Sequence, residues 1–197
     1  MHFKKLIGKR CFLSPCSSDE AEKWAEWDND LEVAIPLGDE AYTTYTLEKM
    51  REILAEVSKQ QSHIFSIVET KTVTSIGRCL LFSIDHVNRQ AMMGIVIGEK
   101  EKWGKGYGQE AINLLLDYGF NLLNLNNIML GTYSFNLRAQ ACFRKVGFKE
   151  IGRRREARIL GKEKYDVVLM DMLAKEFESP YVSQMIEQEP NQKMDDK

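Results

Sequence analysis

The chain has 197 residues, of which 44% are hydrophobic, so it can bury one substantial core and we expect one main domain. Its net charge of -2 gives no electrostatic footprint for bulk nucleic-acid binding. The chain contains no apolar run near the roughly 20 residues of a membrane span, and its basic N-terminus lacks the apolar segment of a signal peptide. The four cysteines show neither Cys-x-x-Cys pairs nor histidines at metal-ligand spacing. We therefore expect a cytoplasmic protein with reduced thiols and no metal.

The first third of the chain reads as one strand and two helices. Residues 10–13 favour a short strand, and Ser17 with Glu20 forms the capping-box pattern that opens a helix. A polar, turn-prone stretch follows over residues 28–45. Residues 46–57 have apolar positions at helical spacing after a threonine that can cap the helix.

The period then changes to that of strands. Short turns join the first three strands, which favours antiparallel hairpins, and the later elements alternate between helix and strand. Asn136 can cap a short helix, and Gly147 can end it in the left-handed conformation. The expected elements are strands at 64–68, 75–84, 90–97, 127–133, 149–159 and 165–173, with helices at 111–123 and 136–146.

These patterns divide the chain into three parts. We expect an N-terminal extension over residues 1–8, one domain over 9–174 and a polar C-terminal tail over 175–197. Within the tail, a short ordered segment is expected at residues 181–186 at most.

A glycine-rich loop lies between the strand that ends near Ile97 and the helix that follows. Gly104, Gly106 and Gly108 stand at alternate positions, so the backbone can turn tightly and approach a ligand without an intervening Cβ. The amides of such a loop and the positive end of the helix dipole favour an anion. The loop therefore predicts a site for phosphate or pyrophosphate.

Three kinds of phosphate loop compete for this stretch. A P-loop requires a lysine followed by serine or threonine, and none closes this loop. A dinucleotide fingerprint requires Gly-x-Gly-x-x-Gly early in a βαβ unit, whereas here three antiparallel strands come first. The third kind wraps the pyrophosphate of coenzyme A. A nucleotide-binding switch, stabilised by ATP or NAD, remains a further alternative.

Two sequence blocks resemble the GNAT superfamily of N-acetyltransferases. Trp103-Gly-Lys-Gly106-Tyr-Gly108 is similar to the family's Gln/Arg-x-x-Gly-x-Gly/Ala signature, with a tryptophan at the first position. The stretch from Asn136 to Phe148 is similar to its Asn-x-x-(Ala/Ser)-x-x-x-(Tyr/Phe/Leu)-x-Lys-x-Gly-Phe block. With the strand order, the resemblance covers roughly residues 9–174. It is greatest to the branch of ribosomal-protein N-terminal and spermidine acetyltransferases.

The resemblance implies an α+β GNAT fold. Its central sheet would be mixed and mostly antiparallel, with about six to seven strands that splay at the coenzyme site, and helices would flank it. Acetyl-CoA would be the cosubstrate, its pantetheine arm held by backbone groups near Ile95, Val96 and Ile97. Its pyrophosphate would lie on the amides of the loop. The residues expected to bind it are therefore Ile95, Val96, Ile97, Trp103, Gly104, Lys105, Gly106, Tyr107, Gly108, Gln109 and Asn136.

The catalytic groups are harder to assign from the sequence. Many relatives use a tyrosine to protonate the departing thiolate, and the matching position here is Phe143, which has no proton to give. Asn136 is the next candidate, because its counterpart contacts coenzyme A or an ordered water. Asp39 and Glu40 are candidate bases, since they lie in the polar segment where this branch builds its acceptor pocket.

The resemblance thus implies an N-acetyltransferase. It would move an acetyl group from acetyl-CoA to a primary amine by direct attack, and the amine would be a protein N-terminus, a polyamine or another small amine. The alternative, favoured by Phe143, is a non-catalytic GNAT-fold module that binds acyl-CoA as a sensor or scaffold. We expect a monomer or homodimer that binds neither bulk nucleic acid nor membrane.

Overall fold

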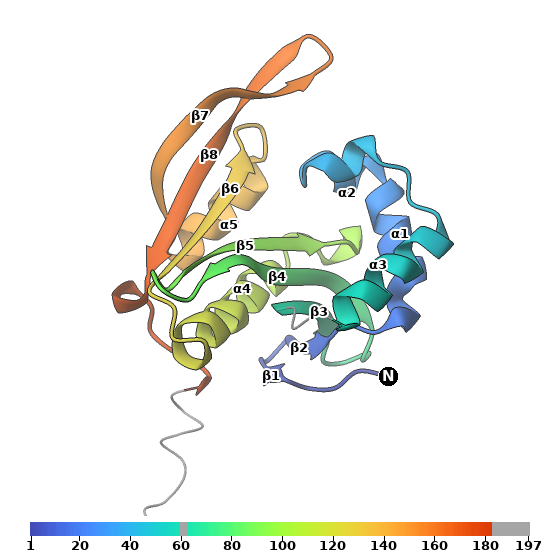
Figure 1. Ribbon diagram of the computed structural model, residues 1–197, viewed down its shortest axis with the longest axis horizontal. Helices are drawn as coiled ribbons and strands as arrows, with labels where there is room; N and C mark the ends of the chain where they lie inside the picture. The colour runs from blue at the N-terminus through green and yellow to red at the C-terminus, as the bar shows by residue number, and fades with distance from the viewer. Residues whose placement is uncertain (60–62, 183–197) are drawn as a thin grey trace, which may run out of the picture.

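A single mixed sheet organises the chain, and the computed structural model describes residues 1–59 and 63–182 (Figure 1). Within these residues the sheet has eight strands in the order β1-β2-β3-β4-β5-β6-β8-β7, all antiparallel neighbours except β5 and β6. This confirms the expected fold class. The strands are β1 (Leu6–Ile7), β2 (Cys11–Pro15), β3 (His63–Glu69), β4 (Ser75–Asp85), β5 (Gln90–Ile97), β6 (Asn127–Tyr133), β7 (Lys149–Leu160) and β8 (Glu163–Leu173).

The eighth strand, β1, was not expected from the sequence. It lies inside the stretch taken as an N-terminal extension, and it pairs Leu6 with Leu13 and Ile7 with Phe12 of β2. Two residues are too few for a periodic signal, so only the partner strand reveals it.

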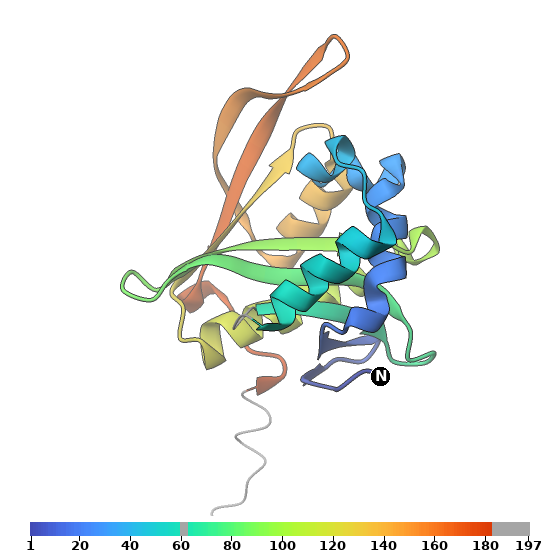
Figure 2. The same cartoon turned by 45° about the vertical axis from the view of Figure 1, so that its right-hand side comes forward.

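The helices cover both faces of the sheet. Figures 1 and 2 show α1 (Ala21–Asn29), α2 (Leu31–Ala34) and α3 (Leu47–Lys59) on one face, with α4 (Tyr107–Asp117) and α5 (Leu137–Val146) on the other. Shorter turns join them: η1 (Ser18–Glu20), η2 (Asp39–Tyr42), η3 (Lys100–Lys102), the π-helical η4 (Tyr118–Leu122) and η5 (Ala174–Glu176). α2 and η2 occupy the stretch expected to be turns.

The helix ends follow the capping residues seen in the sequence. Ser17 and Glu20 form both bonds of the capping box, and the Thr46 hydroxyl accepts the Lys49 amide at 3.2 Å. The Asn136 side chain accepts the Ala139 amide at 3.2 Å, and Gly147 ends α5 with a φ of +119°. These local signals were predicted correctly because each involves neighbours in the chain.

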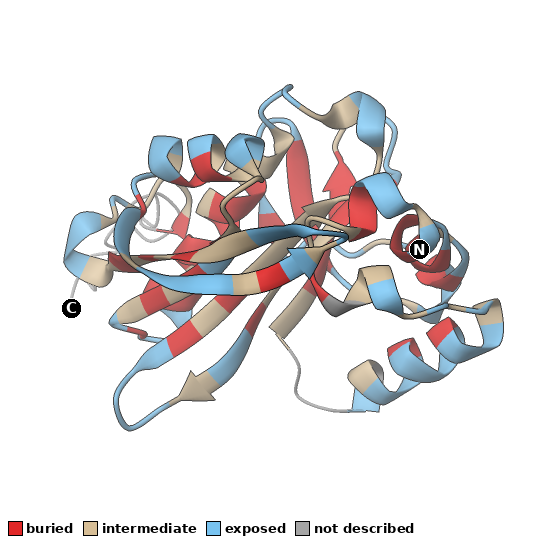
Figure 3. Ribbon diagram, turned by 90° about the horizontal axis from the view of Figure 1, so that it is seen from above, coloured by how far each residue is buried: buried red, intermediate tan, exposed pale blue. Residues whose placement is uncertain are grey.

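Two hydrophobic clusters lie on opposite faces of the sheet. The larger one joins β2–β6 and β8 to α4, with Ile112, Leu115 and Ile128 almost fully buried. The smaller one packs Trp24 and Trp27 of the N-terminal helices against the other face. Figure 3 shows the buried residues along the central strands and the inner sides of the helices. The central strands, including β5, are therefore packed from both faces of the sheet.

β5 and β6 separate along their length. They pair in parallel only at Gln90–Asn127, Ala91–Ile128 and Met92–Met129, and no further pair joins them within the described chain. Beyond Met92, β5 continues to Ile97 beside β4 alone, while β6 continues beside β8. The divergence leaves one edge of residues 93–97 without a strand partner.

Two glutamates fix the glycine loop and the helix that follows it. Glu69, at the end of β3, accepts the Lys102 ammonium at 2.8 and 2.9 Å, the Thr72 hydroxyl at 2.7 Å and the hydroxyl of Tyr107. Lys102 precedes the loop and Tyr107 follows it, so a single carboxylate ties both of its ends. In α4, Glu110 accepts the amides of residues 9, 10 and 11 at 2.8, 2.7 and 2.9 Å, which fixes the helix to the β1–β2 turn.

The described part of the C-terminal region folds back onto α4. The fully buried Asp117 accepts the Ser179 hydroxyl at 2.7 Å and the amides of Tyr181 and Val182, both at 3.0 Å. Residues 183–197 of the expected tail, and with them most of the segment expected at 181–186, lie outside the described residues. No helix among the described residues is long and apolar enough to cross a membrane.

Replacing Glu69 by glutamine should loosen the loop. The hydrogen bonds from Lys102, Tyr107 and Thr72 lower the pKa of this carboxyl from 4.5 to about 2. A depressed pKa contributes stability above pH 4.5 that is lost as the pH falls towards 2. Glu69→Gln should therefore unfold with about 1–3 kcal/mol less free energy than wild type at neutral pH. The difference should shrink below pH 4.5.

Denaturant titrations at several pH values measure this difference. Glu101→Gln is the matched control, because it removes the same charge beside the same loop from an exposed position. Equal stability of Glu69→Gln and Glu101→Gln at neutral pH would contradict the anchoring role of Glu69.

Candidate functional site

The glycine loop is a turn with its amides free. Gly104 and Gly106 have φ values of +70° and +87°, in the left-handed region that favours glycine, and Gly106 is the N-cap of α4. None of the amides of residues 104–109 donates to an acceptor in the part of the chain that the structure describes. Six consecutive free amides at a helix N-terminus form a strong site for an anion.

The loop opens onto a cavity of about 310 Å³ that is lined by α4, α5 and the end of β5, with Val33, Pro36 and Leu37 contributed by α2 and the turn after it. Its floor is formed by Ile95, Val96 and Ile97 of β5, and α5 forms the opposite wall. Its basic residues, Lys102, Arg138 and Lys145, give it a positive lining, and no acidic residue lines it among those described. The cavity therefore suits a long ligand with an apolar arm and several negative charges.

The structure brings most of the predicted binding residues to this cavity and refines the roles of others. Lining it are Ile95, Val96, Ile97, Trp103, Gly104, Gly106, Gly108, Gln109 and Asn136. The side chains of Lys105 and Tyr107 do not line it, and Tyr107 is held by Glu69 instead. The Trp103 amide donates to the Lys100 carbonyl at 3.1 Å, so the run of free amides begins at Gly104.

Trp103 has a structural role in place of the expected glutamine or arginine. Its indole nitrogen donates to the Ile97 carbonyl at 2.6 Å, which satisfies the last residue of the free β5 edge. The Arg138 guanidinium lies 3.5 Å from the centre of its ring, a cation–π contact between the loop and the first turn of α5. Sequence reasoning missed Arg138. Its position two residues after the Asn136 cap was the available signal.

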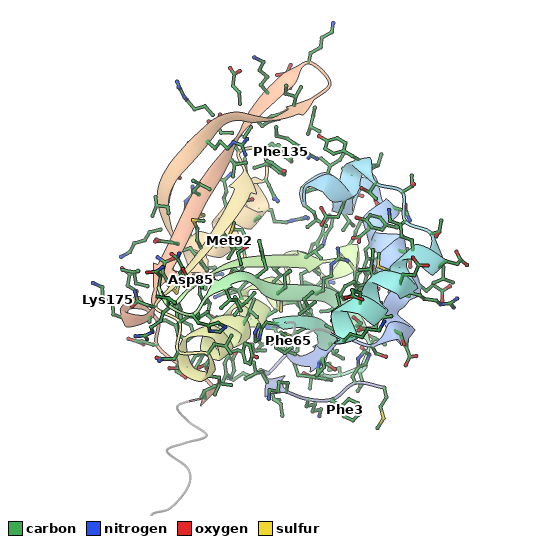
Figure 4. All side chains as sticks on the ribbon, in the orientation of Figure 1. Phe3, Phe65, Asp85, Met92, Phe135 and Lys175 are labelled. Atoms are coloured by element: carbon green, nitrogen blue, oxygen red, sulfur yellow. The ribbon has the colours of Figure 1, made fainter. Side chains whose placement is uncertain are left out.

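A second cavity, of about 420 Å³, lies beyond the diverging strands on the other face of β4 and β5. The two cavities share the lining residues Pro36, Leu37, Ile95, Val96, Asn136, Ala139 and Phe143. They therefore meet at the separation of β5 and β6, which Figure 4 shows next to the labelled Met92.

Asn136 and Phe143 stand at this junction. Among the described residues, Asn136 has the only polar side chain that lines both cavities. Its oxygen caps α5, and no protein partner of its amide nitrogen is found within residues 1–59 and 63–182. Phe143 is 7% exposed and packs its ring against Phe148. The junction thus offers an amide and an apolar wall, without the hydroxyl that a tyrosine would bring.

The two candidate bases, Asp39 and Glu40, both belong to η2. Glu40 of η2 lines the second cavity, together with Arg78 of β4. The neighbouring Asp39 belongs to the same short turn, but its side chain is outside the described part. The structure thus places the Glu40 carboxylate at a cavity.

Replacing Gly106 by valine should abolish binding of the coenzyme A expected from the resemblance. A β-branched valine is strained at the φ of +87° that Gly106 adopts, and its Cβ would lie 3.4 Å from the Arg10 side chain. We expect affinity to fall at least about 100-fold in calorimetric titrations, with the fold retained.

Gly161→Val provides the matched control for this variant. Gly161, in the β7–β8 turn, has a φ of +62° with nothing within 4 Å of an added Cβ, so it suffers similar backbone strain away from the cavity. Wild-type affinity in Gly106→Val would contradict the anion-binding assignment of the loop.

Comparisons with known proteins agree with this geometry. Residues 10–149 match the acetyltransferase (GNAT) domain. An uncharacterised N-acetyltransferase, p20, of Bacillus licheniformis is 28% identical over 174 residues, which cover 87% of this chain and 97% of that protein. The spermidine N(1)-acetyltransferase of Escherichia coli K12 is 34% identical over 114 residues, or 55% of this chain and 61% of that protein.

The solved structures show the same fold. The spermidine N-acetyltransferase of Vibrio cholerae in complex with CoA and spermine has a TM-score of 0.78 at 23% identity, covering 86% of this chain and 99% of that one. A GNAT-family acetyltransferase of Bacillus anthracis has a TM-score of 0.75 at 19% identity, covering 87% and 99%. The domain match spans well over half of the sequence, and the chain therefore belongs to the GNAT family of acetyltransferases.

Proposed function

We propose that this GNAT N-acetyltransferase takes its acetyl group from acetyl-CoA in the first cavity and transfers it to a primary amine in the second. The observation that carries the proposal is the run of six free amides, residues 104–109, at the mouth of a cavity that joins a second one. An anion on these amides and an apolar arm along β5 would direct a thioester to the junction.

The donor matches the lining of the first cavity. The pyrophosphate would accept the loop amides, and Arg138 and Lys145 would add positive charge. The pantetheine arm would lie along β5 near Ile95, because the Ile97 carbonyl already accepts the Trp103 indole. The thioester would then reach Asn136 and Phe143.

The reaction requires no covalent acyl-enzyme. Cys142 is the thiol that lines the first cavity among the described residues, and burial raises its pKa, so it is neutral at physiological pH and a poor nucleophile. Instead the amine nitrogen attacks the thioester carbon, a C–N bond forms and the C–S bond breaks. An ammonium and acetyl-CoA thereby give an N-acetyl amide, the free coenzyme thiol and one proton.

We assign the proton transfers to few groups. Glu40 is the proposed base, directly or through water, because it lines the acceptor cavity. Asn136 is proposed to position the thioester or a water through its free amide nitrogen. With Phe143 at the tyrosine position, the departing thiolate takes its proton from water, which a thiol of pKa about 8.5 permits.

The names of the relatives do not define a single class of acceptor amine. Relatives are named as spermidine N(1)-acetyltransferases and, in Bacillus subtilis, as a putative ribosomal N-acetyltransferase. For this chain we propose a small amine or a peptide N-terminus, acetylated in the cytoplasm, where its four free cysteines stay reduced. The protein would act as a monomer or homodimer.

Thiol release from acetyl-CoA tests the proposal. The protein is incubated with acetyl-CoA and a panel of alkylamines, peptides, polyamines and aminoglycosides. We expect release that depends on an acceptor. Micromolar coenzyme A binding without release across the panel would instead favour the non-catalytic acyl-CoA-binding module, the alternative that Phe143 suggests.

Replacing Glu40 by glutamine should lower kcat about 10- to 100-fold near neutral pH, where the amine is protonated and needs a base. The loss should shrink as the pH approaches about 10.4, where an alkylamine loses its own proton. The measurement is a pH–rate profile with a fixed amine.

Asp39→Asn is the paired control, since it removes the adjacent charge on the same turn. A loss in Glu40→Gln that is equal at every pH, or a loss confined to Asp39→Asn, would contradict Glu40 as the base.

A further inference from the structure

The lining of the second cavity restricts the kind of amine that can occupy it. Its walls are largely apolar, with Leu80, Phe82, Met92, Met93, Leu130 and Val167 among the strand side chains that form them, while Thr132 and Tyr133 of β6 add polar groups. Among the described residues that line it, Glu40 and Arg78 are the charged ones. An acceptor bound here therefore places most of its length against hydrocarbon.

Arg78 is already paired. Its guanidinium donates to Asp28 of α1 at 2.6 Å, with side-chain exposures of 11% and 4% for the two residues. The same guanidinium lies 4.6 Å from the centre of the Trp24 ring. Asp28 is thereby committed to Arg78, so it does not offer a free negative charge to a ligand.

A second buried cation stands close to the same cavity. Arg158 of β7 is 5% exposed, and its guanidinium lies 4.9 Å from the ring centre of Tyr133, which lines the cavity. It donates to the Ile35 carbonyl at 3.4 Å, and none of the ion pairs among the described side chains involves it. Its Nε is buried without an acceptor there. A positive charge placed next to Tyr133 would therefore lie close to a buried guanidinium.

The charged groups around the cavity can balance one ammonium on a ligand. Glu40 can balance the reacting amine, but a second ammonium on the same ligand would lie among largely apolar walls, with the Arg158 guanidinium close by and Asp28 already paired with Arg78. Burying such a charge without a partner is unfavourable. From this we infer that the acceptor is a monocationic amine with an apolar body, such as a hydrophobic monoamine or a peptide N-terminus with an apolar first residue, and not a polyamine.

This inference rests on the proposed transferase function. It also separates the chain from its relatives named as spermidine acetyltransferases, although the fold is shared.

A pair of amines of equal length tests it. Hexylamine and 1,6-diaminohexane differ by one terminal ammonium, and kcat/KM for each is measured by thiol release from acetyl-CoA at one pH. We expect hexylamine to be at least about tenfold better, although the diamine has two reactive ends. An equal or higher kcat/KM for the diamine, or for spermidine, would overturn the inference.

Variants at Phe82 test whether the preference for a monoamine arises in the second cavity. Its side chain is 40% exposed, so replacement should leave the fold intact. Phe82→Asp supplies a carboxylate on the apolar wall and should move the ratio of the two kcat/KM values about tenfold towards the diamine. Asparagine has the same shape as aspartate but no charge, so Phe82→Asn should leave the ratio of the two kcat/KM values near that of wild type.

The outcomes separate the two proposals. An unchanged ratio in Phe82→Asp would overturn the placement of the acceptor body on this wall. No thiol release with any amine, while calorimetry shows coenzyme A binding, would overturn the transferase proposal and this inference together. Release with a preference for polyamines would overturn this inference alone.

Discussion

The Glu69 carboxylate is the constraint on which the donor site depends. A turn with two left-handed glycines has little local stability of its own when none of the amides of residues 104–109 donates to an acceptor in the described part of the chain. Glu69 supplies the missing contacts from outside, through Lys102 before the turn and Tyr107 after it. The loop is thus held in place beside the cavity before a ligand arrives, which lowers the ordering cost of binding.

The separation of β5 from β6 creates the junction between the two cavities. Parallel pairing ends after Met92, and two hydrophobic clusters hold β5 from both faces. Phe143 and Asn136 of α5 occupy the resulting junction, between one cavity with a basic lining and another with apolar walls. A sheet that paired along its whole length would have closed the junction.

Sequence patterns were sufficient for the features made by neighbours in the chain. The glycine loop, the Ser17, Thr46 and Asn136 caps and the order of the long strands were predicted correctly because each depends on local spacing. Features made by distant residues were not accessible. The Glu110 anchor spans about a hundred residues to the β1–β2 turn, and the Trp103–Arg138 stack joins two elements that only the fold brings together.

The division of labour between the two cavities has an evolutionary consequence. The proposed donor site lies on the loop, α4, α5 and the end of β5, whereas β4, β6 and β8 contribute walls to the second cavity alone. Substitutions on the outer face of β4, such as at Phe82, can therefore alter which amine is accepted while the coenzyme site stays unchanged. With this architecture the choice of amine can change independently of the choice of acyl donor.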